Sequence, residues 1–149
     1  MKIIIDADAS PVKNEVIKVA GKFNLKVLLI MSIAHHSDIQ LPDHVERIYV
    51  EKGMDQADFK IIQLAKTGDV IVTQDYGLAS LLLAKNCRVV HHMAYEYTDE
   101  NINRLLEQRH FNSSKRKSGK KTKGPSAFTE KNRKEFEYYF KDLIQKLES

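Results

Sequence analysis

Residues 1–13, MKIIIDADASPVK, decide how the rest of the chain can fold. The three isoleucines at 3–5 form a β-branched run, the composition of a strand buried on both faces of a parallel sheet. The run stops at two carboxylates, Asp6 and Asp8. Open α/β folds bind their ligands at the carboxyl edge of the sheet. The sequence therefore predicts that this strand delivers both aspartates to such an edge.

Strand patterns and helix patterns then alternate along the chain. Ser10 and Pro11 predict an N-cap and the first position of a helix. Buried strands are predicted at 26–31 (KVLLIM), 47–50, 70–73 (VIVT) and 88–91, and helices at 12–23, 54–65, 78–85 and 99–108. Strands that alternate with helices of about ten residues predict an α/β sandwich with a mainly parallel sheet.

The totals are those of an ordinary globular protein with one domain. The chain has 149 residues, of which 42% are hydrophobic and 30% are charged. It begins directly with a strand, and no apolar run has membrane-spanning length, so we expect no signal peptide and no membrane partner. A single cysteine, Cys87, excludes an internal disulfide and suits a reducing compartment. These features predict a cytoplasmic protein.

Charge is distributed unevenly along the chain. Residues 1–108 carry 12 Lys and Arg against 15 Asp and Glu, whereas residues 109–149 carry 12 against 5. Segment 112–126 has neither an apolar residue nor an acid, which predicts that it is flexible when alone. The local positive charge favours an anionic partner. The candidate nucleic-acid contacts are Arg109, Lys115, Arg116, Lys117, Lys120, Lys121 and Lys123.

A final amphipathic helix is predicted at about 130–147, with Thr129 as its N-cap. Its apolar residues keep helical spacing and form one stripe: Phe136, Tyr139, Phe140, Leu143, Ile144 and Leu147. Such a stripe needs a surface to pack against. We expect it to pack on the core formed by residues 1–108, which makes the chain a single domain. Packing on a second subunit, as a homodimer, is the alternative.

Aspartates from several segments can meet at the edge that receives Asp6. Asp75 follows the strand at 70–73 and shares that edge, while Asp55 and Asp58 lie one helical turn apart. Any one of them can merely cap a turn or a helix. Together they would repel one another unless a cation joined them, and hard oxygen ligands favour Mg²⁺ or Mn²⁺. Such a site activates water for phosphodiester cleavage.

Four stretches carry a resemblance to a known family: IIIDADASPVK (3–13), EKGMDQADFKI (51–61), GDVIVTQDYGLASLLL (68–83) and GPSAFTEKNRKEF (124–136). Together they resemble the bacterial YaiI/YqxD family, which is PIN-like. The resemblance implies a three-layer PIN-like sandwich around a mainly parallel sheet, extended by the basic loop and the amphipathic helix.

Within the wider PIN and NYN nuclease group, Asp6 matches the acid that ends the first strand. KGMDQAD resembles the KG-x-D segment of NYN proteins and implicates Asp55 and Asp58. VTQDYGL resembles the PIN pattern T-x-D-x-x-L and implicates Asp75. Many PIN nucleases carry another acid shortly after this aspartate, which is absent here, and Asp8 is the candidate to replace it.

The resemblance implies a metal-dependent nuclease that acts on RNA rather than DNA. Asp6, Asp58 and Asp75 would be the metal ligands, with Asp8 and Asp55 as further catalytic residues. Two alternatives stay open. One is a non-catalytic RNA-binding module, and the other is a haloacid-dehalogenase-like phosphatase with Asp6 as nucleophile and Asp8 as general acid. Zinc is disfavoured, because neighbouring histidines on a strand, as in the 91–92 pair, point to opposite faces.

Overall fold

A computed structural model describes residues 1–35, 37–53, 55–117 and 127–149. Its centre is a six-stranded sheet with the order β3-β2-β1-β4-β5-β6. The first five strands are parallel and β6 is antiparallel to β5. The strands are β1 (Ile3–Asp6), β2 (Val27–Ser32), β3 (Val45–Val50), β4 (Val70–Val72), β5 (Arg88–His91) and β6 (Tyr95–Glu96).

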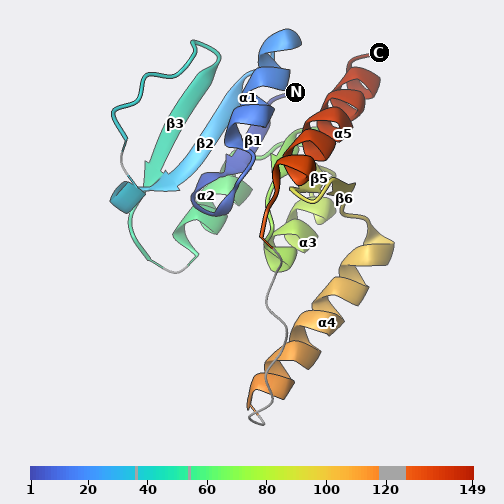
Figure 1. The fold of residues 1–149 in the computed structure, drawn as a ribbon. Helices are drawn as coiled ribbons and strands as arrows, with labels where there is room; N and C mark the ends of the chain where they lie inside the picture. Colours follow the sequence, from blue (N-terminus) through green and yellow to red (C-terminus); the bar gives the residue numbers. More distant parts are fainter. Residues whose placement is uncertain (36, 54, 118–126) are drawn as a thin grey trace.

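Helices cover both faces of this sheet and make three layers (Figure 1). On one face lie α1 (Lys13–Lys22) and α5 (Glu130–Glu148), which pack against each other. On the other lie α2 (Gln56–Leu64) and α3 (Tyr76–Ala84). The α/β sandwich with a mainly parallel sheet is confirmed, and it is consistent with the PIN-like class that the sequence indicates.

Alternation along β1 divides the core between the two faces. Ile3 and Ile5 pack among the residues of α1 and α5, whereas Ile4 packs among those of α2 and α3. All three side chains are fully buried. Because side chains on a strand alternate with a period of two, Asp6 continues the Ile4 side. The strand therefore carries this carboxylate toward α2 and α3.

The apolar stripe of α5 lies in the core of its own chain. Phe136, Phe140 and Ile144 are fully buried on the α1 face of the sheet. Arg133 donates to a carboxylate oxygen of Glu15 at 2.7 Å and to the carbonyl of Pro11 at 2.6 Å, which ties α5 to the start of α1. Because this apolar stripe is buried within its own chain, it gives no reason to expect a homodimer.

Three local predictions differ from the structure. A 3₁₀ turn at Ala7–Ala9 follows β1, and α1 begins at Lys13 with Val12 as its N-cap. The prediction of Ser10 and Pro11 as the helix start was therefore wrong; the Ser10 hydroxyl instead accepts from the Val12 N–H at 3.3 Å. Strand β6 was not predicted, because the turn before it has Ala94 in the left-handed region (φ 67°) where a glycine would have signalled it.

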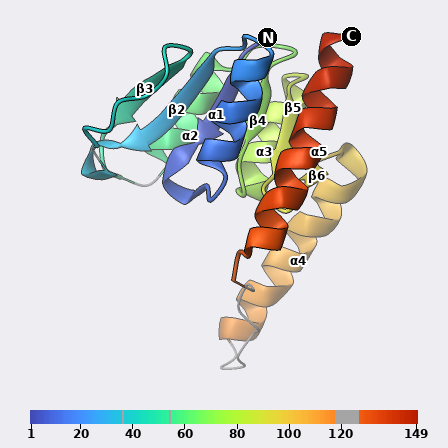
Figure 2. The ribbon, with the colours of Figure 1, turned by 45° about the horizontal axis from the view of Figure 1, so that its top comes forward.

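Helix α4 (Asp99–Lys117) is the third difference. It begins at the predicted residue, Asp99, and Thr98 caps this start, since Thr98 and Asn101 exchange backbone-to-side-chain hydrogen bonds. The helix continues beyond the predicted end at Gln108, because Lys and Arg are good helix formers. It packs on α3 at its start and then extends away from the sandwich (Figures 1 and 2). In the described part of the chain, no helix has the length and apolarity needed to cross a membrane.

Candidate active site

The candidate site lies where the strand order of the sheet reverses. From β1 the chain adds β2 and β3 on one side, and β4 and β5 on the other. The carboxyl ends of β1 and β4 therefore form a topological switch point, the position at which open α/β sheets bind ligands. Asp6 ends β1, and Thr73 and Asp75 follow β4 directly.

Thr73 connects the two aspartates at this point. Its hydroxyl donates to Asp6 Oδ2 at 3.1 Å and accepts from the Asp75 backbone N–H at 3.1 Å. The side chain is buried, and Tyr97 donates a further hydrogen bond to the Thr73 carbonyl at 3.1 Å. Thr73 was not predicted to be a site residue, although the T-x-D pattern contains it. Thr73 fixes how Asp6 is oriented relative to the β4–α3 turn.

Asp75 and Asp58 come to the site from the two helices on the α2/α3 face. Asp75 is the N-cap of α3, where one of its carboxylate oxygens accepts from the Leu78 N–H at 3.1 Å. Asp58 lies in the first turn of α2, one turn before the buried Ile61, so it faces inward. Asp58 lies near enough to Asp75 for the charge of Asp75 to raise the Asp58 pKa.

The charges of these carboxylates act on one another. Burial, and after it the charges of Asp75, Asp6 and Asp55, raise the pKa of Asp58 to about 6. Burial also raises the pKa of Asp6; the hydrogen bond from Thr73 offsets part of this effect, and the charges of Asp75 and Asp8 add to it. The folded protein thus holds acids at one edge of the sheet at an electrostatic cost.

Asp55 lies at the rim of the same site. It precedes α2 in a left-handed conformation (φ 64°) and is exposed. Asp55, Asp58 and Asp75 line a groove of about 420 Å³ between α2 and α3, with apolar walls that include Phe59 and Leu81. Both of these apolar side chains are more than half exposed. Asp58 is therefore within electrostatic reach of Asp6, Asp55 and Asp75, and Asp6 is within reach of Asp75 and Asp8.

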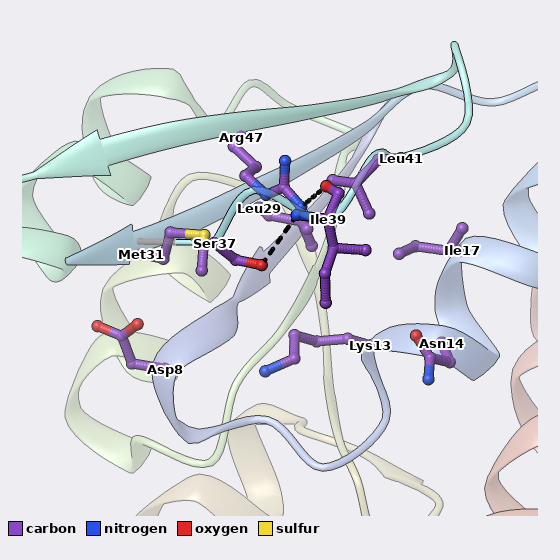
Figure 3. Close-up of a pocket in the computed structure, with 10 residues that line it drawn as sticks. All are labelled: Asp8, Lys13, Asn14, Ile17, Leu29, Met31, Ser37, Ile39, Leu41 and Arg47. Atoms are coloured by element: carbon purple, nitrogen blue, oxygen red, sulfur yellow. Dashed lines mark hydrogen bonds between the residues drawn. The ribbon is translucent and has the colours of Figure 1, made fainter. Parts of the chain in front are cut away.

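Asp8 is engaged elsewhere. Its carboxylate accepts from the Ser32 N–H at the end of β2, at 2.9 Å. It also lines a different cavity, of about 300 Å³, together with Lys13 and Asn14 of α1 and Arg47 of β3 (Figure 3). Asp8 therefore contacts the β2 side of the switch point, whereas the other aspartates face α2 and α3.

The basic candidates belong to a different part of the chain. Arg109, Lys115, Arg116 and Lys117 have their backbone in α4. Lys120, Lys121 and Lys123 lie outside the described residues.

The donor set has the chemistry of a Mg²⁺ or Mn²⁺ site, since it consists of carboxylate oxygens. Across the described residues, however, no group of three or more His, Cys, Asp or Glu side chains stands ready to hold a metal ion. Ligation by Asp6, Asp58 and Asp75 together would require these side chains to draw closer. A divalent cation would supply that attraction, because it would offset the carboxylate repulsion that adds to the effect of burial on the pKa values of Asp6 and Asp58.

Comparison with known proteins agrees with the sequence resemblance. The family model described as "Uncharacterized BCR, YaiI/YqxD family" matches residues 4–146. A UPF0178 protein of Oceanobacillus iheyensis is 53% identical over 146 residues, covering 98% of this chain and all of the relative. A UPF0178 protein of Bacillus cereus is 53% identical over 144 residues, covering 97% and 99%.

Among solved structures, the crystal structure of Rae1 (YacP) from Bacillus subtilis, a W164L mutant, is similar with a TM-score of 0.44 and 16% identity. The match covers 98% of this chain and 99% of that one. The family match spans nearly the whole sequence and includes every candidate aspartate. The chain belongs to the YaiI/YqxD family.

Proposed function

We propose that this protein is a metal-dependent nuclease that hydrolyses phosphodiester bonds, in RNA rather than DNA. The divalent cation, Mg²⁺ or Mn²⁺, would be held by Asp6, Asp58 and Asp75. The observation that carries the proposal is the convergence of these carboxylates from β1, α2 and α3 at the switch point, where two of them have raised pKa values. Clusters of this kind are characteristic of functional sites.

The residues of the chain orient the site. The Thr73 hydroxyl holds Asp6, and the Leu78 N–H holds Asp75 at the start of α3, so two ligands are fixed in direction. Asp58 supplies the third from α2, and Asp55 adds negative charge at the rim. Bound there, Mg²⁺ or Mn²⁺ would act as a Lewis acid on the phosphate and on the attacking water.

The nuclease assignment also draws on the sequence motifs. KGMDQAD and VTQDYGL resemble the NYN and PIN patterns, and the aspartates of both motifs line the α2/α3 groove. The preference for RNA rests on that resemblance. The excess of Lys and Arg after residue 108 supports a polyanionic substrate, because it supplies sequence-independent attraction to phosphates.

A non-catalytic RNA-binding module is the second candidate. The observation in its favour is that, among the described residues, no three acidic side chains are already arranged around a metal position. In this case Asp6 and Asp75 would only hold turns. The phosphatase alternative is weaker, because Asp8, its general acid, accepts a hydrogen bond from the Ser32 backbone on the β2 side.

Cleavage of a labelled single-stranded RNA in the presence of Mn²⁺ separates the two candidates. We expect Asp6→Asn and Asp75→Asn to lose about a hundredfold or more of the wild-type rate, because each removes a charged ligand. Asp43→Asn, which changes an exposed aspartate in the loop before β3, is the matched control and should cleave normally. If no protein cleaves while all of them bind the RNA, the non-catalytic module is the correct function.

A further inference from the structure

A second cavity borders the turn that joins β4 to α3, the turn that also carries Asp75. Its volume is about 380 Å³. Gln74 and Tyr76 line it, whereas Asp75, between them in sequence, lines the α2/α3 groove. The remaining lining residues are His91, His92, Met93, Ala127, Phe128 and Asn132. The β4–α3 turn therefore separates the α2/α3 groove from this second cavity, which we call the aromatic cavity.

Rings from three places in the chain line the aromatic cavity: Tyr76, the adjacent His91 and His92, and Phe128. Tyr95 does not line the cavity but supports His91 from behind. The Tyr95 ring stacks on His91 with centroids 4.8 Å apart and planes 8° apart. The His92 ring lies 4.2 Å from His91, so the expectation that this pair points to opposite faces was wrong; β5 ends at His91, and His92 lies beyond it. Phe128 meets His92 edge-on at 5.4 Å. The Met93 N–H donates to His91 Nδ1 at 2.9 Å, which fixes that ring. The contacts between these rings connect the end of β5, at His91, to Phe128 in the segment before α5.

The cavity is uncharged but lies close to positive charge. None of the described residues that line it is Asp, Glu, Lys or Arg. Burial, and to a lesser extent the charge of His92, lowers the pKa of His91 to about 4, so its ring is neutral at pH 7. Just outside, the Arg133 guanidinium lies 5.2 Å from the centre of the Phe128 ring.

These features suit a nucleobase better than a phosphate. A phosphate subsite needs cationic donors, and none of the described lining residues provides one. A base needs flat rings to stack on and a few polar groups for its edge. Gln74 and Asn132 provide amides; because Asn132 Oδ1 already accepts from Thr129 in the cap of α5, its Nδ2 is the group left to donate.

We propose that the aromatic cavity binds one unpaired nucleobase of single-stranded nucleic acid, next to the phosphodiester that lies at the aspartates. The inference rests on the proposed function for its description of the neighbouring site. It adds a requirement for single strands, because the bases of a duplex are stacked and paired and cannot enter the cavity.

Binding of the full chain to a fluorescein-labelled oligouridylate, measured by anisotropy in EDTA, tests the subsite without cleavage. Loss of a stacking ring should weaken binding about five- to 150-fold. We expect this loss for His92→Ala and for Phe128→Leu, which keeps apolar packing, while Phe128→Tyr keeps wild-type affinity. Tyr138→Ala removes an 80% exposed ring on α5 outside the cavity and should change nothing.

The second probe is an abasic oligomer with the same ribose-phosphate backbone. The subsite requires wild type and Phe128→Leu to bind this probe equally. Equal affinity of all proteins for the oligouridylate would overturn the subsite, and so would an equal loss on both probes, which would indicate a phosphate contact.

Calorimetry with Mn²⁺ distinguishes failure of the subsite from failure of the proposed function. If wild type binds no Mn²⁺ and cleaves no RNA, yet the ring variants lose base-dependent affinity, the nuclease is wrong and the base subsite stands. If wild type binds Mn²⁺ and cleaves RNA, but the ring variants bind like wild type, the subsite alone is wrong.

Discussion

Asp58 lowers the stability of the folded protein when it is ionised, although the proposed metal site needs its negative charge. Its pKa is raised from 3.8 to about 6 by burial and by neighbouring carboxylates. Between those two pH values the folded state binds more protons than the unfolded state, so the free energy of unfolding falls as pH rises through this range. Above pH 6 the full destabilisation is present.

Asp58→Asn should therefore stabilise the metal-free protein. We expect a gain of about 1 kcal/mol at pH 7.5, discounted because the carboxylate is partly in solvent, and little gain at pH 4.5. Urea unfolding in EDTA at both pH values measures this difference. Asp43→Asn serves as the exposed control. Destabilisation of Asp58→Asn at pH 7.5 would show that the carboxylates do not repel one another in the folded state.

The sequence alone identified the site residues that stand at a recognisable position in a local pattern, such as the end of an apolar strand. Asp6 and Asp75 follow apolar strands, and strand order alone brings them to one edge. Thr73 escaped assignment because its role depends on two hydrogen bonds that the chain makes only when β1 and β4 pair. The engagement of Asp8 with Ser32 likewise depends on the pairing of β1 with β2.

At the scale of elements, α5 shows how apolar residues at helical spacing stabilise the fold when they are buried together. Its first turn is closed by a capping box between Thr129 and Asn132. Phe136 and Phe140 stack on each other with centroids 5.4 Å apart, and both are fully buried. The helical spacing of the stripe was readable because this pattern is long and unbroken.

Phe136→Ala should destabilise the protein by about 3–5 kcal/mol, because it removes a large side chain from a site that cannot collapse. Tyr138→Ala, two residues away on the exposed side of the same helix, should change the free energy of unfolding by less than about 0.5 kcal/mol. Chemical denaturation monitored by circular dichroism measures both. Similar effects of the two substitutions would mean that α5 does not pack on the sheet in solution.

Element boundaries were predicted less well than the elements themselves. The predicted start of α1 was too early. The 3₁₀ turn at Ala7–Ala9 contains neither proline nor glycine, so nothing in the sequence indicated a turn there. Strand β6 has only two residues, too few for any periodicity. The end of α4 depends on a run of Lys and Arg that is compatible with either a helix or an open segment.

At the scale of the whole molecule, the distribution of charge separates two tasks. Residues 1–108 contain the whole sheet and the candidate aspartates, and they carry more acids than bases. Most of the excess positive charge follows residue 108, which lets an acidic site and a polyanion coexist in one protein. The basic residues would supply affinity for phosphates, and the aspartates would supply the chemistry.

Replacement of Lys120, Lys121 and Lys123 by Gln tests this division of tasks. Each lost phosphate contact lowers the slope of log affinity against log salt by about 0.7 for a single strand, so the triple variant should lose a slope of about 2. Its Mn²⁺ affinity should stay at the wild-type value. Anisotropy with single-stranded RNA across a salt series gives the slope. An unchanged slope would mean that these lysines do not contact the backbone.

The central claim is that Asp6, Asp58 and Asp75 together hold a divalent cation at the switch point. Isothermal calorimetry with Mn²⁺ on wild type, Asp6→Asn, Asp75→Asn and the Asp43→Asn control tests it most directly. We expect saturable binding by wild type and Asp43→Asn, and affinity at least about tenfold weaker in the other two variants. Negligible binding by all four proteins, or equal binding by all four, would contradict it.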